Sequence, residues 1–231
     1  IMDYSQILAQ QFNIKEEYAK NIITLLDDGN TIPFIARYRK EMHGSMDDQL
    51  IREFAEKLEY LRGLDKRRDE IRSLIDAQEK LTDEINLALD KAATLSELED
   101  IYRPYRPKRK TRASIAKEKG LEPLANDILK QEKGFDPSKS AVDYIDEEKG
   151  VTSVEDAIQG AMDIIAELVS DNAEIRKRIR NLTNANGVLV SVATDEEKDS
   201  VYKNYYDYKE PVKKIAGHRV LAVNRGEKEG F

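Results

Sequence analysis

Apolar residues recur at every third or fourth position along most of the chain, which is the period of an α-helix. The longest stretch of this kind runs from residue 47 to about residue 78, where only Gly63 disfavours helix. Its apolar positions are Leu50, Phe54, Leu58, Leu61, Leu64, Ile71, Leu74 and Ile75. The charges between them alternate in sign, as on a solvated spacer. At 1.5 Å per residue the helix would be about 48 Å long. We therefore predict a long linking helix over residues 47–80.

Shorter helices are predicted before this linking helix. Residues 5–12 and 15–28 have the helical period, and Asn13 between them tolerates the left-handed backbone of a tight turn. Two helices joined by a tight turn could form a DNA-binding helix-turn-helix. However, the second helix carries four acidic residues and is a poor surface for phosphates. We therefore expect the two helices to pack within the fold and not to bind DNA. A further helix is predicted over residues 31–41. Its arginines either contact nucleic acid or pair with acidic neighbours. Residues 1–46 should form an N-terminal helical subdomain.

Residues 81–186 contain several predicted helices, each opening on a side chain that can cap it. The predicted caps are Thr82, Thr94, Thr111, Ser153 and Asp171. The helix after Ser153 is the most apolar, and its small residues Ala157, Gly160 and Ala161 would let a second helix approach closely. We predict that this helix is the buried core of a helical domain over residues 81–186.

Little β structure is predicted. The segment Gly187–Val192 is the one clear β-like run, and no partner strand is obvious. A tyrosine-rich loop follows, with Tyr202, Tyr205, Tyr206 and Tyr208. These rings either stack on bases or dock the loop onto the fold. Residues 187–231 should end in a last helix. The expected fold class is mainly α: an elongated multi-helix assembly with a helix-turn-helix-like part, one long linking helix and little or no β.

The most unusual stretch is Ile101-Tyr-Arg-Pro-Tyr-Arg-Pro-Lys-Arg-Lys-Thr-Arg112, here called the basic tract. It contains no acidic residue, although the whole chain has a net charge of −7. Its cations are Arg103, Arg106, Lys108, Arg109, Lys110 and Arg112. Its two prolines predict an extended link in which helix is blocked at Tyr102 and Arg106. Cations with interleaved aromatic residues favour an anionic partner such as nucleic acid. Alternatively, the tract lies across an acidic face of its own protein.

The candidate nucleic-acid-binding residues are the six cations of the tract together with Lys117, Tyr102 and Tyr105. The two tyrosines are included because their rings could stack on bases. The tract cations would contact phosphates, and such contacts position a nucleic acid without specifying its sequence.

Lys117 belongs to a predicted helical hairpin that follows the tract. Thr111 should cap its first helix, Gly120 should supply the left-handed turn, and Pro123 should open its second helix. The residues that follow helix-turn-helix spacing are Ile115, Ala116, Gly120, Leu121 and Leu129. However, Asn126 stands where an aliphatic residue is expected, and the second helix is acidic. We therefore expect a hairpin that presents Arg112, Lys117 and Lys119 beside the tract, rather than a DNA-reading motif.

The composition argues against several classes of function. The chain has no Cys, which excludes disulfides and thiolate metal sites and fits a reducing cytoplasm. His43 and His218, the only histidines, are too far apart in sequence to suggest a metal site or a catalytic triad. There is no glycine-rich phosphate loop. No apolar run approaches the roughly 20 residues of a membrane span. We expect a cytoplasmic, non-catalytic protein with no metal, no cofactor and no membrane partner.

Several of these stretches together resemble the N-terminal region of the bacterial Tex family, the transcription accessory proteins. They are Leu25-Leu-Asp-Asp-Gly29 running into Thr31-Ile-Pro-Phe-Ile-Ala-Arg-Tyr-Arg-Lys-Glu41, then Glu97-Leu-Glu-Asp followed by the basic tract, and residues 115–125, 205–208 and 218–227. The resemblance implies a helical scaffold with a helix-turn-helix-like part and a long linking helix. In complete family members it implies an RNase H-like domain next, to which residues 187–231 would lead, then helix-hairpin-helix elements and an OB-fold RNA-binding domain.

Two functions are compatible with the sequence. The first is a non-catalytic nucleic-acid-binding scaffold of a transcription accessory factor, with RNA as the favoured partner and DNA as the second. The other is a protein-interaction scaffold that braces domains absent from this sequence, or that docks polymerase or ribosome components. The two predict different surroundings for the tract. Cations that face solvent favour the first function, and cations paired with Asp and Glu favour the second.

Overall fold

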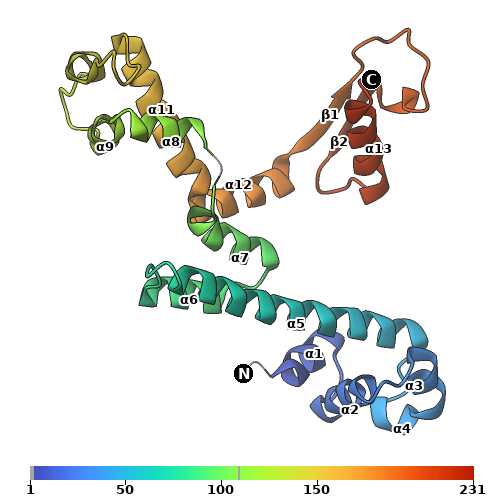
Figure 1. Cartoon of the computed structure of the whole chain (residues 1–231). Helices are drawn as coiled ribbons and strands as arrows, with labels where there is room; N and C mark the ends of the chain where they lie inside the picture. The colour runs from blue at the N-terminus through green and yellow to red at the C-terminus, as the bar shows by residue number, and fades with distance from the viewer. Residues whose placement is uncertain (1–2, 109) are drawn as a thin grey trace. The chain divides into compact units, whose positions relative to one another are not determined.

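The computed structural model describes residues 3–108 and 110–231 (Figure 1). As predicted, the fold is mainly α-helical, and in that part of the chain the only sheet has two strands. The chain separates into two compact units, Ile1–Tyr102 and Arg103–Phe231. The predicted segment 81–186 contributes to both units. Across the described ranges, no helix is both long enough and apolar enough to cross a membrane.

The first unit is organised along the long helix α5 (Asp48–Asp76). The shorter helices before it are α1 (Tyr4–Phe12), α2 (Glu16–Asp27), α3 (Ile32–Tyr38) and α4 (Lys40–His43). Those after it are α6 (Asp83–Lys91) and α7 (Leu95–Tyr102). Figure 1 shows α1–α4 mainly along the N-terminal part of α5, and α6 and α7 at its C-terminal part. The predicted linking helix is therefore a packing platform for the whole unit.

Helix α5 has 29 residues, which corresponds to about 44 Å. Its core-facing residues Phe54, Leu58 and Leu61 pack in one cluster with residues of α1, α2 and α3. Ser45 lies in the turn after α4, with a φ of 64°. Asp47 caps the helix, since its Oδ1 accepts from the Leu50 N–H at 2.8 Å.

Arg68 is buried and links α5 to α6. The pattern of charges along α5 does not predict that this arginine is buried. Its Nε donates to the carbonyl of Leu89 at 2.9 Å, and its Nη2 donates to the carbonyl of Ala92 at 2.9 Å. Its third contact is with the carboxylate of Asp65. Carbonyls at the end of a helix have no partner within the helix. Arg68 satisfies two of them at the C-terminal end of α6 and so fixes that helix against α5.

The second unit begins with the short 3-10 turn η1 (Arg103–Tyr105) and then forms a helical cluster around α11 (Val154–Asp171). The other elements of the cluster are α8 (Arg112–Glu118), α9 (Glu122–Lys130), α10 (Pro137–Ala141) and the turn η2 (Val142–Tyr144). Its core contains Ala116, Leu121, Leu124 and Ala161. Helix α12 (Ala173–Asn186) leads from this cluster to the strands. As predicted, α11 is the core helix, and the side chain of Ser153 caps it.

Gly160 on α11 lies at the closest approach of the α8–α9 hairpin. A Cβ added at Gly160 would lie 2.3 Å from Cδ1 of Leu121 and 3.3 Å from the Cβ of Ala116. Both neighbours are buried, so neither can move into solvent. The prediction that small residues on this helix admit a close neighbour is confirmed.

The expectation that the β-like run has no obvious partner is corrected by the structure. Strand β1 (Val188–Val192) pairs antiparallel with β2 (Asp207–Pro211), which lies within the tyrosine-rich segment predicted to be a loop. Helix α13 (Gly217–Lys228) follows, and the turn η3 (Lys203–Tyr205) precedes β2. The sequence Asp-Tyr-Lys-Glu-Pro has one strong β-former, so its pattern did not predict a strand.

The tyrosine hydroxyls of this segment hold it to neighbouring backbone and side chains. Tyr202 donates to Glu229 at 2.9 Å, and Tyr206 donates to the carbonyl of Lys198 at 2.6 Å. The ring of Tyr202 also lies 5.7 Å from that of Phe231. These contacts match the docking interpretation of the tyrosines.

Gly160 and Gly63, two helical glycines without positive φ, provide a matched test of the packing. At Gly63 on α5, an added Cβ would meet nothing within 4 Å. Gly63→Ala should therefore raise the free energy of unfolding by about 0.5–1 kcal/mol through helix propensity. Gly160→Ala gains the same propensity but overpacks Leu121, which costs about 1–3 kcal/mol, so it should be neutral or destabilising. Urea unfolding followed by circular dichroism measures both. Equal stabilisation by the two changes would contradict the close contact at Gly160.

Candidate nucleic-acid interface

The basic tract begins as helix rather than as an extended link. Helix α7 continues through Tyr102, and Pro104 lies in the 3-10 turn η1. The predicted block at Tyr102 is therefore wrong. A proline is tolerated in a first helical turn because its missing N–H has no partner there. The chain leaves helical geometry at Arg106, as predicted, and the next helix starts at Arg112.

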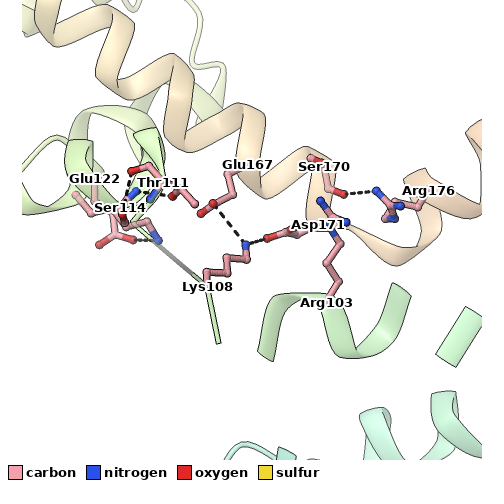
Figure 2. A network of polar contacts seen from close by, with 10 residues as sticks. Arg103, Lys108, Thr111, Ser114, Glu122, Glu167, Ser170, Asp171 and Arg176 are labelled. Atoms are coloured by element: carbon pink, nitrogen blue, oxygen red, sulfur yellow. Dashed lines mark hydrogen bonds and ion pairs between the residues drawn. The ribbon is translucent and has the colours of Figure 1, made fainter. Parts of the chain in front are cut away.

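Two cations of the tract converge on one carboxylate at the end of α11. Arg103 Nε donates to Asp171 Oδ1 at 2.8 Å, and Lys108 Nζ donates to Asp171 Oδ2 (Figure 2). Lys108 Nζ also lies 3.5 Å from Glu167 Oε1, one turn earlier on α11. The Asp171 side chain is only 12 % exposed. The tract is thus tied to α11 by a carboxylate that has little access to water.

The pKa of Asp171 reflects two opposing effects. Burial raises the pKa, because it disfavours the charged form. Hydrogen bonds from Lys108 and Arg103 lower it, and together with the attraction of the two positive charges they leave the pKa below its ordinary value. Asp171 is therefore an ionised partner of both cations at neutral pH.

The outer cations of the site lie in a different environment. Lys110 Nζ is 3.2 Å from Glu118 Oε2, and both side chains are about two-thirds exposed, at 65 % and 64 %. Arg112 is 84 % exposed, and its Nε is 4.0 Å from Asp163. Lys117 Nζ lies 3.2 Å from Glu122 on α9, again between exposed side chains. Exposed pairs such as those of Lys110 and Lys117 contribute about 0–1 kcal/mol each. Arg112 is held weakly for another reason, because its partner Asp163, which is 18 % exposed, lies 4.0 Å away.

The remaining candidates are distributed as follows. Tyr102 is buried, and the guanidinium of Arg67 lies over its ring at 5.5 Å, so the ring is not presented for base stacking. Tyr105 is half-buried and Arg106 is exposed. Arg109 lies outside the described residues. The structure thus brings Arg103 and Lys108 together at Asp171, and places Lys110, Arg112 and Lys117 around α8.

The predicted hairpin is present as α8 and α9. Thr111 and Ser114 form a reciprocal capping box, in which each backbone N–H donates to the other side chain, at 2.8 and 3.0 Å. Gly120 supplies the left-handed turn with a φ of 81°. Lys119, expected beside the tract, instead donates to the carbonyl of Gly150 at 2.8 Å. The exposed basic part of the hairpin is therefore α8 and its approach, rather than α9.

Asp171, which was predicted to cap α12, instead binds two cations of the basic tract. Asn172 caps that helix, because its side chain accepts from the Ile175 N–H at 3.0 Å. Asp and Asn are both common N-cap residues. The local sequence therefore does not decide which of the two adjacent residues, Asp171 or Asn172, caps α12. The tract has six cations and no acidic residue, which was the one sequence feature that pointed to an acidic partner outside the tract.

His43 has a structural role. His43 is fully buried: its Nδ1 accepts from the Met46 N–H at 3.0 Å, and its Nε2 lies 2.9 Å from the carbonyl of Ile35. This arrangement makes His43 a structural link between α3 and the turn after α4. Within the described residues, no group of three or more His, Cys, Asp or Glu side chains is placed to hold a metal ion.

Comparison with known proteins gives two family matches. Residues 2–76 match the Tex-like protein N-terminal domain, and residues 132–231 match the Tex central region-like domain. The Bacillus subtilis protein YdcI is 46 % identical over 97 % of this chain and 32 % of its own length. The transcriptional accessory protein Tex of Neisseria gonorrhoeae is 39 % identical over 99 % of this chain and 30 % of its own length. The human S1 RNA-binding domain-containing protein 1 is 31 % identical over 97 % of this chain and 23 % of its own length.

The chain thus spans about a third or less of the length of these relatives. Its two matched regions follow one another in sequence, and the bacterial relatives that carry the name Tex align with nearly all of it. The chain belongs to the Tex family of transcription accessory proteins, and it matches the N-terminal region of that family.

Proposed function

We propose that this chain is a non-catalytic scaffold that binds nucleic acid, RNA in preference to DNA, through phosphate contacts within a cytoplasmic transcription accessory factor. The proposal rests on the division of the basic tract into two kinds of cation. Arg103 and Lys108 anchor the tract to Asp171. Lys110, Arg112 and Lys117 remain exposed in weak pairs around α8.

The exposed cations are suited to phosphates for an energetic reason. An exposed ion pair contributes little to stability, so a phosphate can displace a carboxylate from Lys110 or Lys117 at small cost. Arginine offers several N–H donors in a plane that matches phosphate oxygens. Contacts of this kind do not read bases, so little sequence preference is expected. The names of the relatives are consistent with such a role, since one is a transcriptional accessory protein and another contains an S1 RNA-binding domain.

A protein-interaction scaffold is the second candidate, and the anchored cations favour it. Arg103 and Lys108 are paired with acidic groups of their own protein, which is the surrounding expected if the tract is part of the architecture. Under this alternative the outer cations would contact other domains of the family chain or components of the transcription or translation machinery. The nucleic-acid measurement below separates the two candidates.

Replacing Lys110, Arg112 and Lys117 by Ala should weaken binding of single-stranded RNA. Each lost phosphate contact also removes about 0.7 from the slope of log affinity against log salt. The slope of the triple variant should therefore be shallower by about 2. Fluorescence anisotropy with labelled RNA and DNA oligonucleotides at several salt concentrations measures both quantities. The parent chain should bind the RNA oligonucleotide more tightly than the DNA oligonucleotide.

The matched control removes three exposed lysines of the same unit, Lys130, Lys139 and Lys149, each of which pairs with an Asp three residues away. It loses the same formal charge but should keep the affinity and the salt slope of the parent chain. If both triple variants bind alike, the assignment of the tract fails. If the parent chain binds neither RNA nor DNA, the protein-interaction candidate replaces the proposed function.

The anchoring role of Asp171 predicts a stability that depends on pH. Asp171→Asn should lower the free energy of unfolding by about 1–2 kcal/mol at pH 7, because two charge-assisted hydrogen bonds weaken. The folded pKa of Asp171 is lowered, so its contribution is complete above the pKa of an unfolded Asp, near 3.9. It is lost as the pH falls from that value through the folded pKa.

Urea unfolding of the parent and Asp171→Asn chains at pH 7 and near pH 3.5 measures this dependence. The difference in stability between the two chains should shrink at the lower pH. A difference of the same size at both values would mean that Asp171 acts through packing rather than through its charge.

A further inference from the structure

The β1–β2 hairpin has two outer edges, and the register defines which backbone groups lie on them. The Val212 N–H donates to the carbonyl of Gly187 at 2.9 Å, and the Ala193 N–H donates to that of Tyr206 at 2.8 Å. Antiparallel pairs alternate between hydrogen-bonded and non-hydrogen-bonded positions. The N–H and C=O groups of Val188, Val190 and Val192 therefore point away from β2. In the part of the chain that the structure describes, no hydrogen bond reaches them.

The outer edge of β2 is protected against further pairing, whereas that of β1 is not. The outward positions on β2 are Asp207, Lys209 and Pro211. Pro211 has no N–H to donate, and charged residues on an edge discourage the addition of another strand. β1 reads Val-Leu-Val-Ser-Val, with no charge and no proline. One edge of the hairpin is thus closed by its sequence and the other is open.

The same three valines also form an exposed apolar stripe. Val188, Val190 and Val192 are 53 %, 52 % and 65 % exposed. The alternate residues Leu189 and Ser191 are half-buried and face the other way. Residues 189–192 line a cavity together with Ala222, Val223 and Gly226 of α13. The opposing residue Glu210 accepts from Arg219 of α13 at 2.8 Å. Helix α13 therefore covers one face of the hairpin and leaves the valine face in contact with water.

We propose that the open edge of β1 pairs with a third strand from the part of a longer Tex-family chain that lies outside these 231 residues. A row of unpaired backbone groups on a strand edge is a template to which another strand can add. A two-stranded hairpin is at best marginally stable alone. The length of the relatives indicates where this third strand comes from. This chain spans only 32 % of YdcI and 30 % of the gonococcal Tex protein. Most of a family chain is thus available to supply the strand.

A second copy of this chain fits the edge less well. Symmetric antiparallel pairing of two β1 strands centred on Val190 would place both valine stripes on the same face of the joint sheet. That arrangement doubles the exposed apolar surface instead of covering it. A strand from the rest of the family chain has no such constraint, since the segments beside it can cover the valine face.

Hydrogen exchange tests the proposal with an internal control. In the 231-residue chain, the amides of Val188, Val190 and Val192 should exchange rapidly, while those of Leu189 and Ser191, bonded to β2, should exchange slowly. In full-length YdcI, the residues aligned with the three valines should exchange at least about fivefold more slowly than in this chain, as a single added hydrogen bond requires. The same alternating pattern in full-length YdcI would overturn the proposal. Protection that appears in the 231-residue chain as its concentration rises would assign the edge to a second copy and would also overturn it.

A proline pair provides a second readout. Val190 and Lys209 lie directly opposite each other, and each directs its N–H outward. Proline at the YdcI position aligned with Val190 should abolish the extra protection of its neighbours, whereas proline at the position aligned with Lys209 should leave it intact. Equal effects of the two substitutions would mean that the β1 edge is not a pairing surface. Neither result depends on nucleic-acid binding, so this inference and the proposed function can fail independently.

Discussion

The second unit depends on how closely the α8–α9 hairpin approaches α11. Gly160 leaves no side chain between α11 and the buried residues Ala116 and Leu121. This contact fixes α8, whose start is set by the capping box at Thr111. The end of the basic tract is therefore attached to one part of α11. Its beginning is attached to the last residue of the same helix, because Arg103 and Lys108 bind Asp171. Helix α11 and the hairpin packed on it thus hold the tract from Arg103 onward.

The sequence predicted most of this framework because its signals are local. Helical period located α5 and α11, and side-chain caps at Thr82, Thr111 and Ser153 fixed where helices begin. Caps and periods depend on residues a few positions apart, so a single sequence displays them.

The features that the sequence did not predict depend on partners far along the chain. Asp171 lies 68 positions from Arg103, and its neighbour Asn172 gave an equally good local reading as a cap. Strand β2 is charged and contains a proline, so only its pairing with β1 identifies it as a strand. Arg68 looks like one of many surface cations on α5, and its burial follows from the position of the end of α6. In each case a distant contact overrides the local pattern.

The burial of Asp171 also limits where a nucleic acid can bind the tract. A phosphate that took Arg103 or Lys108 would remove one of the two cations that neutralise the Asp171 carboxylate, which has little access to water, and weakening the pairing of a buried charge is costly. At Lys110 and Lys117 the displaced partners, Glu118 and Glu122, are exposed and return to water with little loss. A phosphate backbone should therefore follow α8 and its approach and avoid the corner at Asp171. The contacts that make Arg103 and Lys108 part of the architecture leave Lys110 and Arg112 available for an anionic partner.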